Sequence, residues 1–144
     1  MRICLVGDAH SIHLQRWVHY FLSEGHEIAL ACPEYDPSRA DTELLRGASI
    51  HVFDWVLKRP FTLRHRLASR REWLRLRLFL CSLAPDLVHV HYIPVSSSVF
   101  FFWGLRNLAI STWGSDIVYG GEGPEARRAR FYKRFLLSQA KVIT

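Results

Sequence analysis

The chain has 144 residues, of which 49% are hydrophobic and 22% are charged, and its formal net charge is +6. This length suits one domain with a proper core, and the composition excludes disordered and fibrous proteins. We therefore expect a single, basic, folded domain over residues 1–144.

The cysteines and the apolar segments indicate the cellular compartment of the protein. Cys4, Cys32 and Cys81 lie in apolar segments without C-x-x-C spacing, which favours buried, reduced thiols over a disulfide framework. The apolar start of the chain is too short for a signal peptide. The most apolar stretch, residues 93–105, contains three serines and is shorter than the roughly 20 residues of a membrane span. We expect a cytoplasmic protein without a transmembrane segment.

Strand and helix signals alternate in the first half of the chain. A strand is expected at 2–6, and Gly7 opens the turn after it. A helix follows between an N-cap at Ser11 and a stop signal at Gly25. Its residues Leu14, Trp17, Val18, Phe21 and Leu22 repeat at the spacing of one buried face. Further strands are expected at 27–32 and 48–53, with a loop and a short helix at 37–47 between them.

The alternation continues to the end of the chain. The longest helix is expected at 62–83 and is closed by Pro85. The elements expected after it are a strand at 86–91, an apolar helix at 95–106, a strand at 108–112, a loop at 119–123, a helix beginning at Pro124 and the start of a strand at 141–144. This order predicts an α/β fold, a Rossmann-like three-layer sandwich with a mostly parallel sheet and helices on both faces.

Two apolar, β-branched runs, at 86–92 and 108–116, end abruptly at polar, ring-bearing or glycine residues. Ligands of open α/β sheets bind just beyond the carboxyl ends of such strands. The residues placed there are His91, Trp113, Gly114, Ser115 and Asp116. Asp116 is the ionisable group of its turn, where it either orients a substrate hydroxyl or caps the turn through backbone N–H groups.

Two histidines alternate with valines in the first of these runs. Successive side chains of a strand point to opposite faces, so His89 and His91 share one face. His91 lies nearer the strand end and is the better site candidate, whereas His89 is expected to be a hydrogen-bonded core residue.

The turn after the first strand carries a second group of candidates. Asp8, His10, His13 and Arg16 are expected at the same end of the sheet as His91. Arginine binds phosphates or sugar carboxylates in bidentate fashion. Gly7 either brings backbone amides close to a phosphate or only ends the strand. The turn lacks the G-x-G-x-x-G pattern of dinucleotide-binding proteins.

Positive charge is concentrated in two helical segments. The first contains Lys58, Arg59, Arg64, Arg66, Arg70, Arg71, Arg75 and Arg77, with Leu63, Leu67, Leu74 and Leu78 at helical spacing. The second contains Arg127, Arg128, Arg130, Lys133 and Arg134 among aromatic residues. Such helices either lie on an anionic membrane surface or present a solvated face over the core.

Four segments occur in the order and spacing of a known enzyme family. They are the strand that starts Met-Arg-Ile, the helix end at 24–27 (Glu-Gly-His-Glu), the strand at 85–91 (Pro-Asp-Leu-Val-His-Val-His) and the turn at 113–116 (Trp-Gly-Ser-Asp). With these segments the chain resembles, over essentially its whole length, the N-terminal half of family 4 glycosyltransferases.

The resemblance implies the GT-B architecture, in which two Rossmann-like domains face each other across a cleft. This chain would be the N-terminal, acceptor-side domain, without the C-terminal domain that holds most of the nucleotide-sugar donor. The implied reaction moves a hexosyl group from a nucleotide-diphosphate donor to a lipid-linked or envelope polysaccharide acceptor, with retention at the anomeric carbon. No cofactor and no metal are implied, and the isolated domain is expected to be inactive.

The resemblance also gives the candidate residues their roles. His91 and Asp116 are the expected catalytic residues. The expected substrate-binding residues are Gly7, Asp8, His13, Arg16, Trp113, Gly114 and Ser115. His13 is favoured over His10 because residues 11–17 resemble a Ser-Ile-His segment found in a subset of the family. Many relatives carry a histidine at the position of Trp113, and an indole can stack on a sugar but cannot act as a base.

Two other interpretations remain open. The chain could be a non-catalytic subunit that recruits a donor-binding partner to the inner face of the cell membrane, a role that the basic helices also fit. It could also be a flavodoxin-like, nucleotide-binding regulator. Nucleic acid is not an expected partner, because no DNA- or RNA-binding motif is present.

Overall fold

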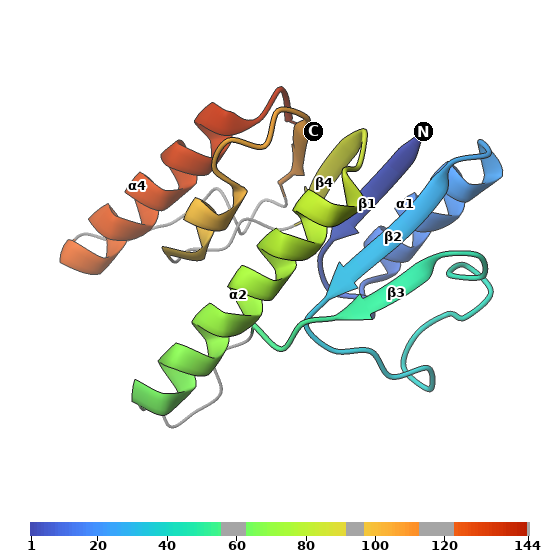
Figure 1. Ribbon diagram of the computed structural model, residues 1–144, viewed down its shortest axis with the longest axis horizontal. Helices are drawn as coiled ribbons and strands as arrows, with labels where there is room; N and C mark the ends of the chain where they lie inside the picture. Colours follow the sequence, from blue (N-terminus) through green and yellow to red (C-terminus); the bar gives the residue numbers. More distant parts are fainter. Residues whose placement is uncertain (56–62, 92–96, 113–122, 144) are drawn as a thin grey trace.

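The structure, a computed structural model, describes residues 1–55, 63–91, 97–112 and 123–143 (Figure 1). Its strands are β1 (Arg2–Val6), β2 (Glu27–Cys32), β3 (Ser49–Val52), β4 (Leu87–His91), β5 (Leu108–Ser111) and β6 (Val142–Ile143). They form one sheet in the order β3-β2-β1-β4-β5-β6, and every pair of neighbours is parallel. This is a Rossmann-like α/β fold, as the alternation of elements predicts.

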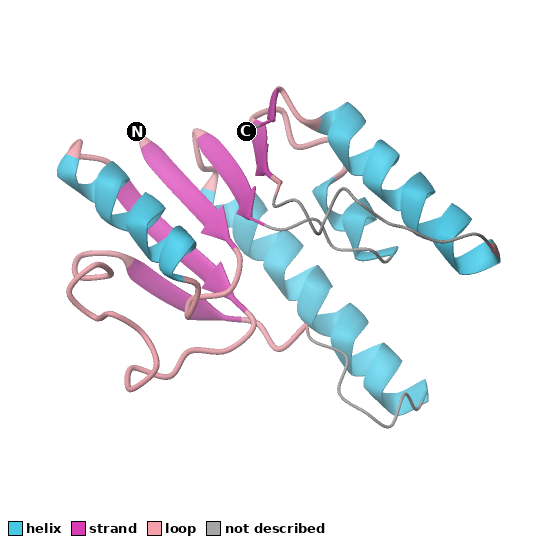
Figure 2. Cartoon of the chain, turned by 180° about the vertical axis from the view of Figure 1, so that it is seen from behind, coloured by secondary structure: helices cyan, strands magenta, loops and turns pink. Residues whose placement is uncertain are grey.

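The helices are distributed over the two faces of the sheet (Figure 2). Helix α1 (Ile12–Ser23) covers one face, and α2 (Leu63–Leu83), the 3₁₀ helix η1 (Ser97–Phe102) and α4 (Pro124–Gln139) cover the other. The three predicted layers are therefore present. Both faces of the central strands are buried, which explains why these strands are nearly continuous apolar runs in the sequence.

Strand β1 shows how the two layers of core are built. Cys4 and Val6 point into the core beneath α2, whereas Ile3 and Leu5 point toward α1. All four side chains are almost completely buried. The strand thus joins the two hydrophobic cores at the centre of the sheet.

The ends of α1 agree with the sequence signals, and its buried face differs in one respect. Ser11 is the N-cap residue, and Gly25 follows the helix with φ +77°, a conformation that favours glycine. Leu14 and Val18 are buried as predicted. The polar residue Gln15 is buried beside them.

Two predicted helical segments take other conformations. The segment at 37–47 forms turns, because the Asp36 and Asp41 carboxylates accept backbone N–H groups two and three residues ahead, which competes with helix formation. The apolar helix expected at 95–106 is the 3₁₀ helix η1 within the described residues, and Gly104 lies beyond its end at φ +74°. The predicted serine-rich start of this helix has low intrinsic helix propensity.

The cysteines are all free thiols. Burial raises the pKa of Cys4 to about 12, and burial together with Asp8 does the same for Cys32. Cys81, in contrast, is exposed, which corrects the expectation that all three are buried. None of the described helices combines the length and apolar character that crossing a membrane requires.

Candidate active site

The candidate site lies at the carboxyl ends of β1 and β4. These neighbouring strands occupy the centre of the sheet, and the chain continues from β1 to β2 on one side and from β4 to β5 on the other. A reversal of strand order opens a crevice at this edge of an α/β sheet. Gly7 follows β1, and His91 is the last residue of β4.

Gly7 is required by the close approach of β4. A Cβ atom at this position would lie 3.1 Å from the Cβ of His91 and 3.1 Å from Cδ2 of Leu14. The Gly7 N–H donates to the Ala31 carbonyl over 3.0 Å. This amide is therefore already engaged, and the structure supports close packing rather than phosphate binding by the Gly7 N–H.

The two histidines of β4 form a buried pair on the α1 side of the sheet. The centroids of the His89 and His91 rings are 4.3 Å apart, and His89 Nε2 is hydrogen-bonded to Ser111 Oγ at 2.8 Å. Val88 and Val90 point to the opposite core. The shared face was predicted correctly. Among the described residues, which include neither the segment after β4 nor the turn after β5, His91 is only 6% exposed.

Burial keeps both imidazoles neutral. It lowers the pKa of His89 from 6.5 to about 4, and burial together with His89 lowers the pKa of His91 to about 3. Within the described chain, neither ring nitrogen of His91 has a hydrogen-bond partner. His91 is thus a neutral group with unused donor and acceptor capacity.

Trp17 connects this pair to an open pocket. Its ring centroid lies 5.3 Å from that of His89 and 6.1 Å from that of His91. The indole also lines a pocket of about 430 Å³ together with His13, Arg16 and Tyr20, which we call the α1 pocket. The structure therefore brings the predicted residues His13 and Arg16 together. Their i, i+3, i+4, i+7 spacing is the signal that could have found Trp17 and Tyr20.

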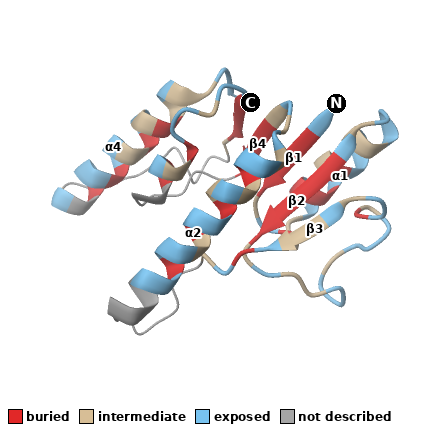
Figure 3. Ribbon diagram, viewed as in Figure 1, coloured by how far each residue is buried: buried red, intermediate tan, exposed pale blue. Residues whose placement is uncertain are grey.

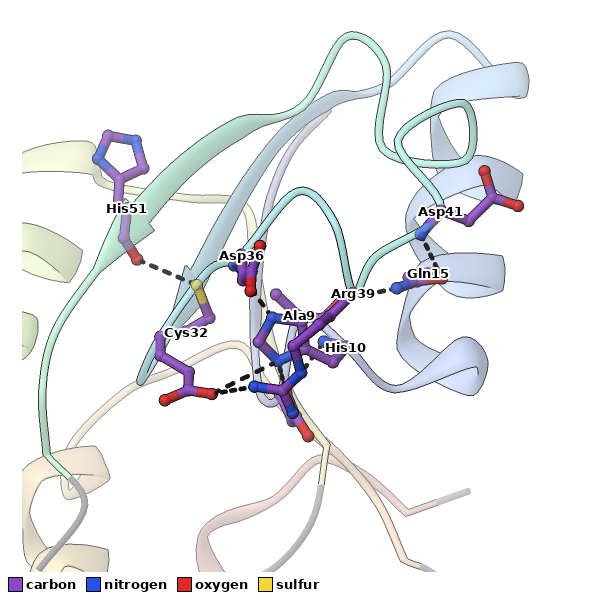
Figure 4. A network of polar contacts seen from close by, with 10 residues as sticks. Ala9, His10, Gln15, Cys32, Asp36, Arg39, Asp41 and His51 are labelled. Atoms are coloured by element: carbon purple, nitrogen blue, oxygen red, sulfur yellow. Dashed lines mark hydrogen bonds and ion pairs between the residues drawn. The ribbon is translucent and has the colours of Figure 1, made fainter. Parts of the chain in front are cut away.

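His10 and Asp36 belong to a polar network that joins two loops (Figure 4). The His10 Nδ1 and Asp8 Oδ1 atoms are 3.1 Å apart, and the Asp36 N–H donates to His10 Nε2 over 3.0 Å. The structure thus gives His10, the less favoured histidine of this turn, a defined set of partners.

The remaining candidates are not placed by the structure. Trp113, Gly114, Ser115 and Asp116 lie outside the described residues and follow β5 by two to five positions. In the part of the chain that is described, no three side chains of His, Cys, Asp or Glu form a group that could hold a metal ion.

Comparison with known proteins identifies the family. The model of a family described as glycosyl transferase 4-like matches residues 2–144. The chain belongs to this family. The glycosyl transferase 4-like domain has no match among curated proteins.

A solved structure supports the fold of this glycosyl transferase 4-like domain. The crystal structure of MurG from Acinetobacter baumannii matches it with a TM-score of 0.61 at 14% sequence identity, over 99% of this chain and 40% of the MurG chain. The chain thus spans about two-fifths of the length of MurG. At this low identity, the structural likeness shows the fold alone, which is the Rossmann-like domain of a GT-B protein.

Proposed function

We propose that this chain is the acceptor-side domain of a retaining glycosyltransferase. The enzyme transfers a hexosyl group from a nucleotide-diphosphate sugar to a lipid-linked or envelope polysaccharide acceptor. The observation that carries the proposal is the α1 pocket, one of whose lining residues, Trp17, packs against the buried His91. Family membership supports the transferase chemistry.

The α1 pocket offers the two kinds of contact that a glycan acceptor needs. The ring planes of Trp17 and Tyr20 are nearly perpendicular, with centroids 6.2 Å apart, and present apolar surface to a sugar face. Arg16 is exposed, and no ion-pair partner for it is found among the described residues. Its guanidinium is available for a phosphate or carboxylate of the acceptor.

We assign the polar chemistry to His91 and Asp116. A neutral imidazole with two unengaged nitrogens suits a hydrogen bond to the acceptor hydroxyl. Asp116 orients the same hydroxyl from the turn that continues β5. Trp113, Gly114 and Ser115 of that turn and Asp8 of the first turn complete the proposed substrate-binding residues, and Gly7 provides the space in which β1 and β4 approach each other. The donor is held mainly by a second domain, and no metal or other cofactor is used.

Substitution of Asp116 tests this assignment. Asp116→Ala in the full-length protein should lower turnover by a factor of at least about 100, the usual scale of a lost polar group in the transition state. Turnover is the release of nucleoside diphosphate from a panel of UDP- and GDP-sugars with a lipid extract of the source cells. Circular dichroism should show an unchanged fold. Turnover equal to the wild type would remove Asp116 from the mechanism.

We also propose that the domain works at an anionic membrane surface. Helix α2 carries buried and exposed residues along its length (Figure 3). Its buried face is formed by Ser69, Trp73, Leu76 and Leu80, whereas Leu67, Leu74 and Leu78 are each more than half exposed. Arg70 and Arg71 are exposed on the same helix. Exposed leucines among arginines are typical of helices that insert into the headgroup region of a bilayer.

Helix α4 adds a second basic surface in the same layer. Arg127, Arg128, Arg130 and Arg134 are exposed, as is the ring of Phe131. Lys133, which the sequence placed in this run, is only 6% exposed and does not contribute to that surface. The positive surface is therefore carried by arginines.

Vesicle sedimentation tests the membrane contact. The full-length protein should sediment with phosphatidylglycerol vesicles and not with phosphatidylcholine vesicles. The double variant Leu74→Ser/Leu78→Ser should weaken this binding at least about tenfold, whereas Ile12→Ser, an exposed change on α1, should not. Equal sedimentation of all three proteins would reject α2 as the contact surface.

A further inference from the structure

His10 lies between two loops that leave neighbouring strands. Its backbone N–H and its Nδ1 atom both contact Asp8 Oδ1, at 3.0 Å and 3.1 Å. Its Nε2 atom accepts the Asp36 N–H over 3.0 Å. The turn after β1 is thereby linked to the loop after β2 through a single imidazole, whose side chain is only 9% exposed.

Gln15 makes a second link between the same two segments. Its Nε2 donates to the Ala9 carbonyl over 2.8 Å, and its Oε1 accepts the Asp41 N–H over 3.4 Å. Gln15 is 2% exposed, so these bonds form away from water. The loop after β2 is therefore held to the first turn at two points five residues apart, which Figure 4 shows together.

The contacts of His10 define its protonation state. A nitrogen that accepts an N–H cannot carry a proton, so the ring proton lies on Nδ1 and is donated to Asp8. His10 therefore has no free lone pair to accept a substrate proton. The contacts from His10 hold the Asp8 carboxylate in place. The Asp8 side chain remains 61% exposed beside the candidate site.

We propose that His10 is a positioning residue of the acceptor site, which holds Asp8 and the first turn in place through its neutral Nδ1–H tautomer. The inference rests on the proposed acceptor-side function of the domain. It assigns His10 an indirect role, because the imidazole acts through Asp8 and not on the substrate. Protonation at Nε2 would turn the acceptor into a donor and break the link to Asp36.

Several charged groups surround the imidazole. Asp8 belongs to its own turn, and Glu34 lies 4.0 Å from Nδ1 on the loop after β2. Asp36 and Arg39 belong to the same loop, and Arg39 is paired with Glu34 at 2.8 Å. Hydrogen bonds from Ser38 lower the pKa of the Asp36 carboxyl group.

Substitution of His10 by each of the two amide residues distinguishes the contact at Nδ1 from the contact at Nε2. The side-chain oxygen of His10→Gln lies near the position of Nε2 and retains an acceptor for the Asp36 N–H without titrating. The shorter side chain of His10→Asn reaches Asp8 but not Asp36. Ser23→Ala, an exposed change at the far end of α1, is the matched control.

Two readouts on the full-length protein test the proposal. The first is the hydrogen-exchange protection of the Asp36 amide, measured by NMR at pH 7 and corrected for the intrinsic exchange rate. The second is the KM for a lipid extract of the source cells as acceptor, measured with the sugar nucleotide that the wild type uses.

The proposal predicts about a tenfold loss of protection at Asp36 in His10→Asn, the scale of one hydrogen bond. The KM for the acceptor should rise by a similar factor, with kcat much less changed. His10→Gln should keep the protection at Asp36, because its side-chain oxygen replaces Nε2, whereas its KM should rise because the Nδ1–H that is donated to Asp8 is lost. The control should match the wild type throughout.

Two results would overturn the proposal. One is wild-type protection in His10→Asn, which would show that no link through Nε2 exists. The other is lost protection with an unchanged KM, which would make the link structural only. A wild-type protein that transfers no sugar under any condition would count against the proposed function itself, and the exchange data would still decide on the link.

Discussion

Gly7 and His91 approach so closely that a methyl group on Gly7 would lie 3.1 Å from the Cβ of His91. Contact at that distance forces a neighbour to move. The backbone of Gly7 does not adopt the left-handed conformation that glycine favours, unlike that of Gly25. The glycine after β1 is therefore needed for space, and it sets how closely β1 and β4 pack at the candidate site.

Gly7→Ala should destabilise the protein by about 1–3 kcal/mol, the usual cost of extra volume in a packed region. Gly25 is the matched control, because nothing lies within 4 Å of its added Cβ and its φ is +77°. Gly25→Asn should cost little, since asparagine tolerates that conformation, whereas Gly7→Asn should cost more than Gly7→Ala. Urea unfolding measures all three. A Gly7→Ala variant with the stability of the wild type would contradict the close approach of Gly7 and His91.

The His89–His91 pair should make stability fall in mild acid. Both folded-state pKa values lie below 6.5, so the unfolded chain binds more protons below that pH. The contribution is complete above about pH 6.5 and is lost as the pH falls toward 4 and 3. Each histidine adds at most about 1.4 kcal/mol per pH unit to the slope.

The free energy of unfolding at pH 7 and pH 5 measures this effect. His91→Asn should reduce the difference between the two values, while His19→Asn, at an exposed position on α1, should leave it unchanged. The same difference in all three proteins would show that the β4 histidines are not buried in solution.

Substitutions in the α1 pocket should change the affinity for the acceptor but not the free energy of unfolding. Tyr20 is 53% exposed, so Tyr20→Ala should change the free energy of unfolding by less than about 0.5 kcal/mol. If the ring stacks on the acceptor, the KM for the lipid-extract acceptor should rise several-fold. His19→Ala is the control on the other side of the helix. An unchanged KM in Tyr20→Ala would remove the ring from the acceptor pocket.

Much of the fold could be predicted because buried parallel strands are apolar throughout. The predicted strand at 27–32 coincides with β2, and that at 86–91 starts one residue before β4. The buried face of α2 was harder to predict. Leu74 and Leu78 are as apolar as Leu76 and Leu80, so periodicity alone cannot decide which pair faces the core.

The site was predicted less completely, because its geometry depends on contacts between distant residues. His91 follows an apolar run, which correctly places it at the strand end, but its contact with Trp17 on α1 joins residues 74 positions apart. The role of His10 depends on the Asp36 amide, 26 positions away. No local pattern reveals either contact.

The most direct test of the account is transfer of a labelled sugar by the full-length protein. UDP- and GDP-sugars with radiolabelled hexoses would be incubated with a lipid extract of the source cells, and label in the lipid phase would be counted. The account predicts that one donor labels the lipid fraction and that Arg16→Gln reduces this labelling. Tight binding of a nucleotide without transfer from any donor would contradict the account.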